Sequence, residues 1–222
     1  ASSQTFVENH TVELGTVDGS DIFYSLNNSE YKKYDKPIII NKQIVISSYA
    51  QKNKIKSKTV TSEYFPRDDS KKIKILSTYA NQYAAAGDKT LIDQLRGGNN
   101  YRTGNWQGYR EDLNVIVDIS KVKKINSISL GCHQDVRSWI FYPKQVDYWT
   151  SLDGENYTYQ GKVLANFPDN IEGSLQKDFK LNVKNLKARY IKIKAENYGI
   201  CPDWHLGAGG KTWIFVDEIT IK

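Results

Sequence analysis

The sequence has 222 residues and a formal net charge of +6, with 39% hydrophobic and 12% aromatic residues, two Cys and no Met. Aliphatic runs such as residues 38–40 fall far short of the roughly 20 apolar residues in a membrane helix, so we expect no membrane insertion. Two cysteines cannot form a disulfide scaffold, and the apolar and aromatic content excludes a disordered chain. Because the chain begins with Ala1 and lacks Met, we expect a processed chain or a piece of a longer one.

The positive charge is spread along the chain rather than gathered in one segment. Lysines alternate with uncharged residues at 52–58, and again at Lys192 and Lys194. Lysine with a period of two is typical of the solvent face of a strand, whereas nucleic-acid binding requires a concentrated basic stripe with aromatic residues inside it. We therefore expect no nucleic-acid partner.

Apolar residues alternate with polar residues in several short segments. In chain order the clearest pairs are Ile38 and Ile40, Ile44 and Ile46, Val115 and Val117, Ile191 and Ile193, and Ile219 and Ile221. These segments are rich in Ile, Val, Tyr and Thr and are separated by Gly, Asn, Asp and Pro, which predicts short antiparallel strands. The only helix predicted is a turn or two at residues 89–95. The chain should therefore be all-β, arranged as a sandwich or barrel.

A polar segment at residues 65–72 predicts a domain boundary. It combines Pro66 with paired acidic residues and paired lysines, directly after an expected strand at 59–65. The boundary separates residues 1–66 from residues 71–222. All five tryptophans lie in the second region: Trp106, Trp139, Trp149, Trp204 and Trp213. We expect the first domain to be a spacer or packing module and the second to carry recognition.

Three segments of the second region, residues 97–109, 132–143 and 197–210, each combine Gly, aromatic rings and planar hydrogen-bonding side chains. This mixture suits sugars, because a pyranose stacks its C–H face on an aromatic ring while its hydroxyls bind Asp, Asn, Gln and Arg. The alternative is that Trp106, Trp139 and Trp213 belong to the core. Trp204 follows Pro202-Asp203 and precedes a glycine-rich tract, so we expect its ring to be exposed.

Several strings resemble known families. Residues 102–109, the strand at 117–119 and the hairpin at 148–157 resemble the coagulation factor V/VIII C-type, discoidin-like module, near carbohydrate-binding module family 32. Residues 137–144 and 204–218 resemble the C-terminal module of bacterial β-N-acetylhexosaminidases (chitobiases) of glycoside hydrolase family 20. Residues 22–26, 34–38 and 44–50 resemble the immunoglobulin-like module of such enzymes, with Asn27-Asn28 where an Asp-Gly turn is usual.

The resemblance implies a small immunoglobulin-like β-sandwich (1–66) followed by a discoidin-like jelly-roll β-sandwich (71–222). It implies a non-catalytic, carbohydrate-binding part of a secreted, periplasmic or outer-surface enzyme, with the missing catalytic domain as a partner. Catalysis in that family uses an Asp-Glu pair in a (β/α)₈ barrel of about 250 residues. This sequence has no such stretch, and we read Asp217-Glu218 as structural, so we expect no enzymatic activity.

The expected ligand is a glycan of the N-acetylhexosamine or galactose type. For ring stacking we predict Trp204, with Tyr198 or Trp139 second. For polar contacts we predict Arg102, Gln134, Asp135, Arg137, Asn197 and His205. The family resemblance also implies one structural Ca²⁺ near Asp93 and Glu218. If Ile219 and Ile221 face the core, Glu218 points the other way, so this metal site needs a bulge in the last strand.

Other functions remain open at this stage. The aromatic loops could dock on the missing catalytic domain instead of binding sugar. Residues 140–142 could form an apolar spike for lipid binding. Four potential zinc ligands, Cys132, His133, Cys201 and His205, lack a usual structural spacing, and the two cysteines could instead form one disulfide.

Overall fold

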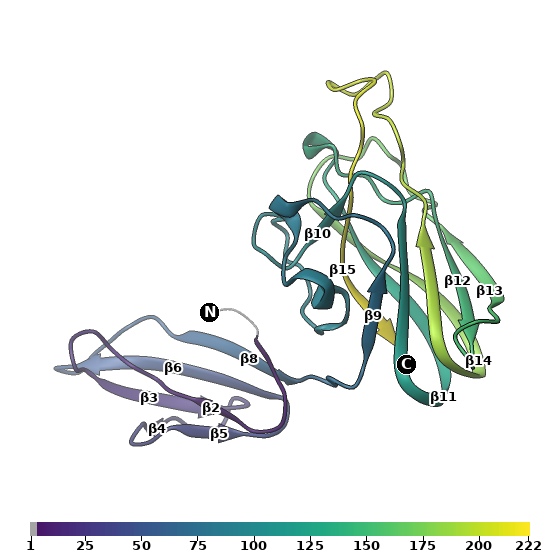
Figure 1. Cartoon of the computed structure of the whole chain (residues 1–222). Coiled ribbons are helices and arrows are strands. Elements are labelled where there is room, and N and C mark those ends of the chain that lie inside the picture. The colour runs from purple at the N-terminus through teal and green to yellow at the C-terminus, as the bar shows by residue number, and fades with distance from the viewer. Residues whose placement is uncertain (1–3) are drawn as a thin grey trace. The chain divides into compact units, whose positions relative to one another are not determined.

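The structure is a computed structural model that describes residues 4–222, and the chain divides after Asp69 into two compact units (Figure 1). Strands dominate both units. The helices in the described part of the chain are three short 3-10 segments, η1 (Asn81–Tyr83), η2 (Gly87–Ile92) and η3 (Val136–Ser138). None of them is long and apolar enough to cross a membrane. The all-β prediction is confirmed, and η2 overlaps the expected helical turn.

The first unit consists of two β-layers. A six-stranded sheet has the order β1-β8-β6-β3-β4, with β7 paired to β6, and a two-stranded sheet joins β2 to β5. The strands are β1 (Gln4–Phe6), β2 (His10–Val12), β3 (Asp21–Leu26), β4 (Lys32–Lys33), β5 (Ile38–Ile40), β6 (Ile44–Lys52), β7 (Ile55–Lys56) and β8 (Val60–Pro66). Ile38 and Ile40 lie in the core between the layers, whereas Ile39 is 73% exposed, as the alternation predicts. Asn27 and Asn28 adopt positive φ in the turn after β3.

The second unit is a sandwich built on two long strands. β11 (Leu113–Gln134) and β14 (Leu175–Ala195) pair along most of their lengths, with register shifts between residues 118 and 127 of β11. The first half of β11 also pairs with β9 (Lys72–Ile75) and the second half with β15 (Ile214–Ile221). The two long strands therefore serve both layers. β12 (Gln145–Ser151) and β13 (Thr158–Leu164) extend one layer, and β10 (Gln107–Tyr109) the other.

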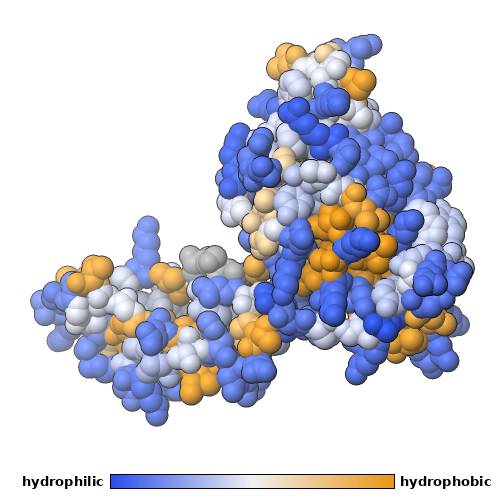
Figure 2. Space-filling view, in the orientation of Figure 1, coloured by the Kyte–Doolittle hydropathy of each residue, from blue (hydrophilic) through white to orange (hydrophobic). Residues whose placement is uncertain are grey.

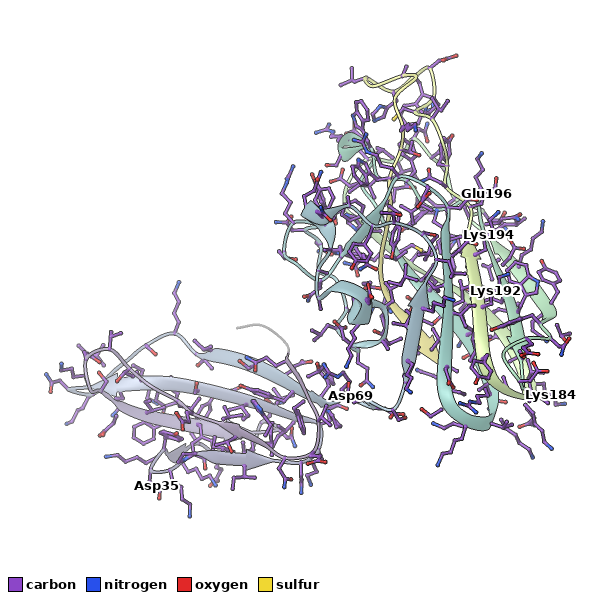
Figure 3. All side chains as sticks on the ribbon, viewed as in Figure 1. Asp35, Asp69, Lys184, Lys192, Lys194 and Glu196 are labelled. Carbon is purple, nitrogen blue, oxygen red and sulfur yellow. The ribbon has the colours of Figure 1, made fainter. Side chains whose placement is uncertain are left out.

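The core of the second unit follows the predicted alternation. Val115 and Val117 of β11 and Ile191 and Ile193 of β14 are completely buried in it. Between and beyond the two isoleucines, Lys192, Lys194 and Glu196 are less buried, and Figure 3 labels them at the end of β14 and just after it. The predicted jelly-roll sandwich is confirmed, and its strands leave several loops to build a site.

Candidate functional site

A cleft of about 630 Å³ lies among three loops of the second unit. They are the turn after β11, which holds η3, the loop from β13 to β14, and the loop from β14 to β15. The last loop forms the tip of the unit, drawn in yellow at the top of Figure 1, and Figure 2 shows apolar surface there. The cleft is lined by Val136, Arg137, Trp139, Glu172, Trp204, His205, Leu206 and Gly207. Four of the nine residues predicted for sugar binding therefore meet in one place.

Trp204 presents the exposed ring of the cleft. Its exposed fraction is 49%, whereas the other four tryptophans are buried or half-buried. The ring contacts Phe141 at 6.3 Å and His205 at 5.6 Å between ring centroids. Leu206, beside it on the loop, is fully exposed. A ring that is braced but open to solvent can stack on a sugar.

His205 is buried and holds the loop in place, which corrects the predicted sugar contact. Its Nε2 lies 2.6 Å from the carbonyl oxygen of Val136, and the backbone N–H of Gly207 donates to Nδ1 at 2.9 Å. Because Nδ1 accepts, the proton resides on Nε2, which donates to Val136. Both ring nitrogens are thus used inside the protein, and neither remains for a ligand.

Trp139 supports the same loop from below. Gly207 and Gly210 lie directly on its indole, since a Cβ at either position would come within 2.4 Å of ring atoms. The backbone of Trp139, directly after η3, is in the left-handed region, with a φ of 65°. The chain turns there, and the indole lies against the loop from β14 to β15. The predicted stacking role of Trp139 stays a prediction. The indole is a platform for backbone, and only part of it lines the cleft.

Arg137 and Glu172 form an ion pair at the cleft, with side chains 74% and 60% exposed. The hydrogen bond and charge of Glu172 raise the pKa of Arg137, and Asp135 adds to this effect. Asp135 itself is half-buried and accepts a hydrogen bond from Ser138 at 3.0 Å. Sequence reasoning missed Glu172, because its loop contains no tryptophan and matches no motif.

The remaining predicted residues lie outside the cleft. Tyr198 stacks on Phe141 at 4.7 Å and donates its hydroxyl hydrogen bond to Asp169. Arg102 covers the ring of Tyr101 and lines a separate pocket of about 220 Å³. Neither residue faces Trp204 across the cleft, so the structure gives them no part in this site.

Gln134 and Asn197 are buried, and their predicted sugar contacts are also corrected. The Gln134 side-chain oxygen accepts from the backbone of Tyr142 at 3.3 Å. The Asn197 side-chain oxygen accepts from the Thr212 hydroxyl at 2.7 Å and from the backbone of Gly199 at 2.8 Å. These amides stabilise the loops from within.

The predicted metal ligands Asp93 and Glu218 are both buried, at 5% and 4% exposure. The pairing of β15 with β11 shifts between Leu130 and Cys132, so that Asp217 and Glu218 together face one residue. This is the bulge that the alternation required. The Glu218 carboxylate accepts the backbone N–H of Gln94 at 2.9 Å. Burial, helped by the nearby Asp93 charge, raises the pKa of Glu218 to about 8.

Asp217, the neighbour of Glu218, has a structural role, as expected. Its carboxylate accepts from the side chain of Arg96 and the backbone of Gly97, both at 2.9 Å, and from the backbone of Glu218 at 2.7 Å. Although burial raises the pKa of Asp217, Arg96 and the backbone donors oppose that shift. Asp217 thereby ties the loop after Leu95 to the last strand.

Three alternatives raised by the sequence do not form in the described residues. Ile140, Phe141 and Tyr142 are buried, so the alternative of a lipid-binding spike is wrong. Cys132 and Cys201 are free thiols in separate apolar clusters. Across residues 4–222, no three His, Cys, Asp or Glu side chains gather in a way that could hold a metal ion, which leaves the zinc alternative without a site.

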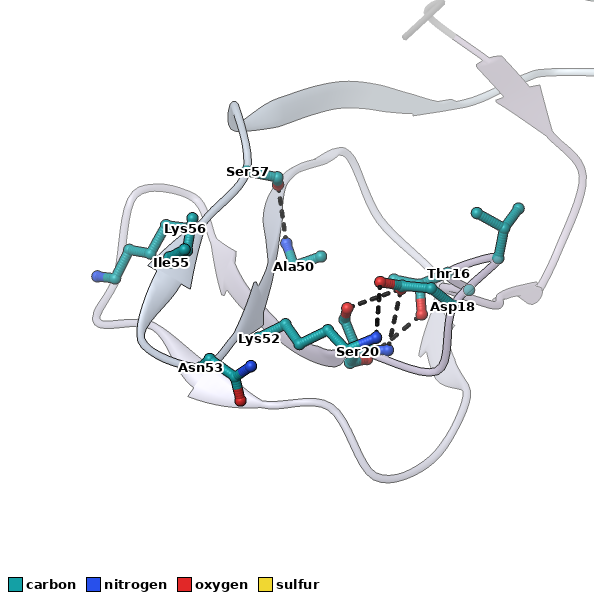
Figure 4. A pocket seen from close by; sticks show the side chains of 11 residues that line it. Thr16, Asp18, Ser20, Ala50, Lys52, Asn53, Ile55, Lys56 and Ser57 are labelled. Carbon is teal, nitrogen blue, oxygen red and sulfur yellow. Dashed lines mark hydrogen bonds and ion pairs between the residues drawn. The ribbon is translucent and has the colours of Figure 1, made fainter.

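The first unit has a wider depression of about 700 Å³, shown in Figure 4. Asp18 in its wall already accepts from the Ser20 hydroxyl at 2.7 Å and lies 3.5 Å from the Lys52 ammonium. None of the residues that line the depression is aromatic. It therefore offers no ring for a sugar, and the cleft at Trp204 remains the candidate site.

Comparison with known proteins identifies a family match. Residues 70–210 match the family model for the F5/8 type C domain. No curated protein matches the chain.

Among solved structures, one similar to this chain is the family 32 carbohydrate-binding module of NanJ from Clostridium perfringens, in complex with galactose. It is 15% identical, with a TM-score of 0.43, and the match covers 68% of this chain and 93% of that one. The module CpGH89CBM32-5 from the same organism, in complex with GalNAc-β-1,3-galactose, is 16% identical, with a TM-score of 0.42, covering 68% and 94%. The Streptococcus pneumoniae fucose binding module SpX-3 is 12% identical, with a TM-score of 0.42, covering 68% and 93%.

Proposed function

The chain belongs to the F5/8 type C domain family, and from this premise we propose that its second unit is a non-catalytic carbohydrate-binding module. The observation that carries the proposal is the exposed Trp204 ring beside the Arg137–Glu172 pair in one cleft. The ring offers a flat apolar face, the guanidinium offers donors, and the carboxylate offers acceptors. These are the complements of a pyranose C–H face and its hydroxyls.

The cleft is built for weak binding of a small ligand. His205 and Trp139 fix the loop beneath Trp204, so little ordering of the backbone is needed on binding. With one open ring and one polar pair in a solvated site, we expect dissociation constants of roughly millimolar to tens of micromolar. The expected ligands are N-acetylhexosamines or galactose.

The test is an NMR titration of the protein with N-acetylglucosamine, N-acetylgalactosamine, galactose and chito-oligosaccharides. Shifts should be confined to the three cleft loops. Trp204→Ala should weaken binding at least about tenfold, since the stacking ring is lost. Tyr159→Ala removes another exposed aromatic ring, on β13, and should leave binding unchanged. If no sugar shifts the cleft loops, the proposal fails.

We further propose that the chain is the C-terminal part of a glycoside hydrolase family 20 β-N-acetylhexosaminidase, with an immunoglobulin-like first unit and an exported location. The support is that the two segments with this resemblance, 137–144 and 204–218, both contribute to the cleft. The test is the coding sequence around this chain. It should encode a barrel with an adjacent Asp-Glu pair, and the whole polypeptide should hydrolyse N-acetylhexosaminides.

A second candidate function is docking on that catalytic domain. It is favoured by the exposed Leu206 and by Ile200, which is 59% exposed on the same loop. Such a surface should bind the isolated catalytic domain, and Leu206→Ser should weaken this binding. A domain pair that does not associate, together with sugar binding by the second unit alone, would exclude docking.

A structural Ca²⁺ held by Asp93 and Glu218 is also proposed. Two buried carboxylates close to one another supply the oxygen ligands that this hard cation prefers, and the ion would neutralise their charge. Calcium should raise the melting temperature relative to chelator, and Glu218→Gln should remove that response. An unchanged midpoint in the unmodified protein would contradict the site.

A further inference from the structure

We propose that Glu172 makes the cleft select neutral sugars over sugar acids, an inference that rests on the proposed carbohydrate-binding function. Few polar side-chain groups of the lining remain available to bond a ligand. Both nitrogens of His205 are bonded within the protein. Apart from Arg137 and Glu172, the other lining residues are aliphatic, glycine or tryptophan, and the only polar group of a tryptophan is its indole N–H donor. Recognition of charge, and acceptance of a hydrogen bond from a sugar hydroxyl, by side chains of the lining therefore depend on this pair.

The charge around the cleft disfavours an anionic ligand. Arg137 is the one basic side chain of the lining, and its guanidinium is bonded to Glu172. Asp135 lies close enough to interact with the same guanidinium. Two carboxylates thus surround a single positive charge. A sugar carboxylate drawn to Arg137 would have to displace Glu172 or stay next to it, and either costs free energy through like-charge repulsion.

A neutral sugar fits the pair without that cost. A hydroxyl group can donate to Glu172 while it accepts from Arg137, so adjacent hydroxyls can bridge both side chains. The ion pair occupies only part of the five guanidinium N–H groups and four carboxylate lone pairs. Since both side chains are more than half exposed, the remaining groups are open to a ligand.

Glu172 is carried by a loop that is fixed on both sides. Asp169 accepts a hydrogen bond from Tyr198, and Ser174 donates one to the carbonyl oxygen of Asn99. The ring of Phe167 packs edge-on against Tyr142 at 5.6 Å. These contacts come from three different segments of the unit. They fix the loop that carries Glu172, and the ion pair with Arg137 then places its carboxylate at the cleft before any ligand arrives, which favours selection by ligand charge.

The experiment compares sugars that differ only in charge at C6. The pairs are galactose with galacturonate, and N-acetylglucosamine with its C6 carboxylate analogue, titrated by NMR at low ionic strength because salt screens the repulsion. The unmodified protein should bind the neutral member of its preferred pair at least about tenfold more tightly. Glu172→Gln should reduce that ratio about tenfold, or about 1.4 kcal/mol. Glu155→Gln removes an exposed glutamate from the turn between β12 and β13 and should keep the original ratio.

The outcomes separate this inference from the function on which it rests. If neutral sugars bind but Glu172→Gln leaves the ratio unchanged, the role of Glu172 is overturned and the binding function stands. A preference of the unmodified protein for the acidic members would overturn it as well. If no member of either pair binds the unmodified protein or the variant, the binding function fails together with the inference.

Discussion

Two loops of the second unit carry tryptophan near glycine, and they place the ring in opposite ways. Trp106 is 1% exposed and donates its indole N–H to the carbonyl of Gly98 at 3.0 Å, whereas Trp204 is 49% exposed. A Cβ at Gly97 would lie 1.9 Å from the indole of Trp106. None of the chain's glycines, all of which the structure describes, has Trp204 among its nearest neighbours. A glycine pressed on the ring therefore distinguishes the covered indole from the open one.

The largest expected effect is the difference in stability between removing the covered ring and removing the open ring. Trp106→Ala should lower the free energy of unfolding by about 3–5 kcal/mol, because it empties a buried site next to Tyr101 and Phe215. Trp204→Ala should lower it by about 1 kcal/mol or less. Denaturant unfolding followed by tryptophan fluorescence measures both, since all five tryptophans lie in the second unit. Equal losses in the two variants would break the comparison.

The glycine contact itself can be tested next. Gly97→Ala forces a methyl group into the Trp106 indole and should cost about 1–3 kcal/mol. Gly98→Ala is the matched control, because no atom lies within 4 Å of a Cβ there and its φ is not positive. It should change stability by about 0.5 kcal/mol or less. If the two variants unfold at the same denaturant concentration, the close approach is not what keeps Trp106 covered.

The sequence was sufficient for the fold because alternation is a local property. Val115, Val117, Ile191 and Ile193 lie in the core as their period of two requires, and each neighbouring polar residue is less buried. Even the bulge at Glu218 could be expected from the sequence. In a regular strand, Glu218 would point to the opposite face from Ile219, whereas the predicted metal site requires it beside Asp93. Local patterning cannot show that both faces of a strand are covered. At the end of β11, Cys132 and His133 point in opposite directions and both are buried.

The site was less predictable, because loops have no period that fixes the direction of a side chain. Trp204 and His205 are neighbours in the sequence, yet one is open and the other is bonded inside the protein. Their roles depend on Gly207 and Trp139, which come close only in the folded chain. Glu172 matters because Arg137, 35 residues away in the sequence, lies opposite it. Composition located the loops but could not supply this pairing.

The smallest expected effect concerns the histidines of the same two regions. His205 has a partner for each ring nitrogen, whereas neither ring nitrogen of His133, buried beside Trp106 at 4.9 Å, makes a hydrogen bond of good geometry. Burial lowers the pKa of His133, although the charge of Asp135 and the nearby backbone of Leu175 oppose the shift. As the pH falls below the ordinary histidine pKa of about 6.5, the unfolded chain takes up a proton that the native state does not. Stability should therefore decrease on acidification, by at most about 1.4 kcal/mol per pH unit.

His133→Phe should remove this dependence, and the measured quantity is the difference in unfolding free energy between the two proteins from pH 7.5 to 5.5. The difference between the two proteins is needed because the titration of Glu218 changes the unfolding free energy with pH in the opposite direction to that of His133. Its native pKa of about 8 exceeds the usual 4.5, so in chelator its protonation stabilises the native state as the pH falls. This contribution is common to both proteins and cancels. If the two proteins show the same pH dependence, His133 is satisfied in solution, and the region around Trp106 is as fully hydrogen-bonded as the loop of His205.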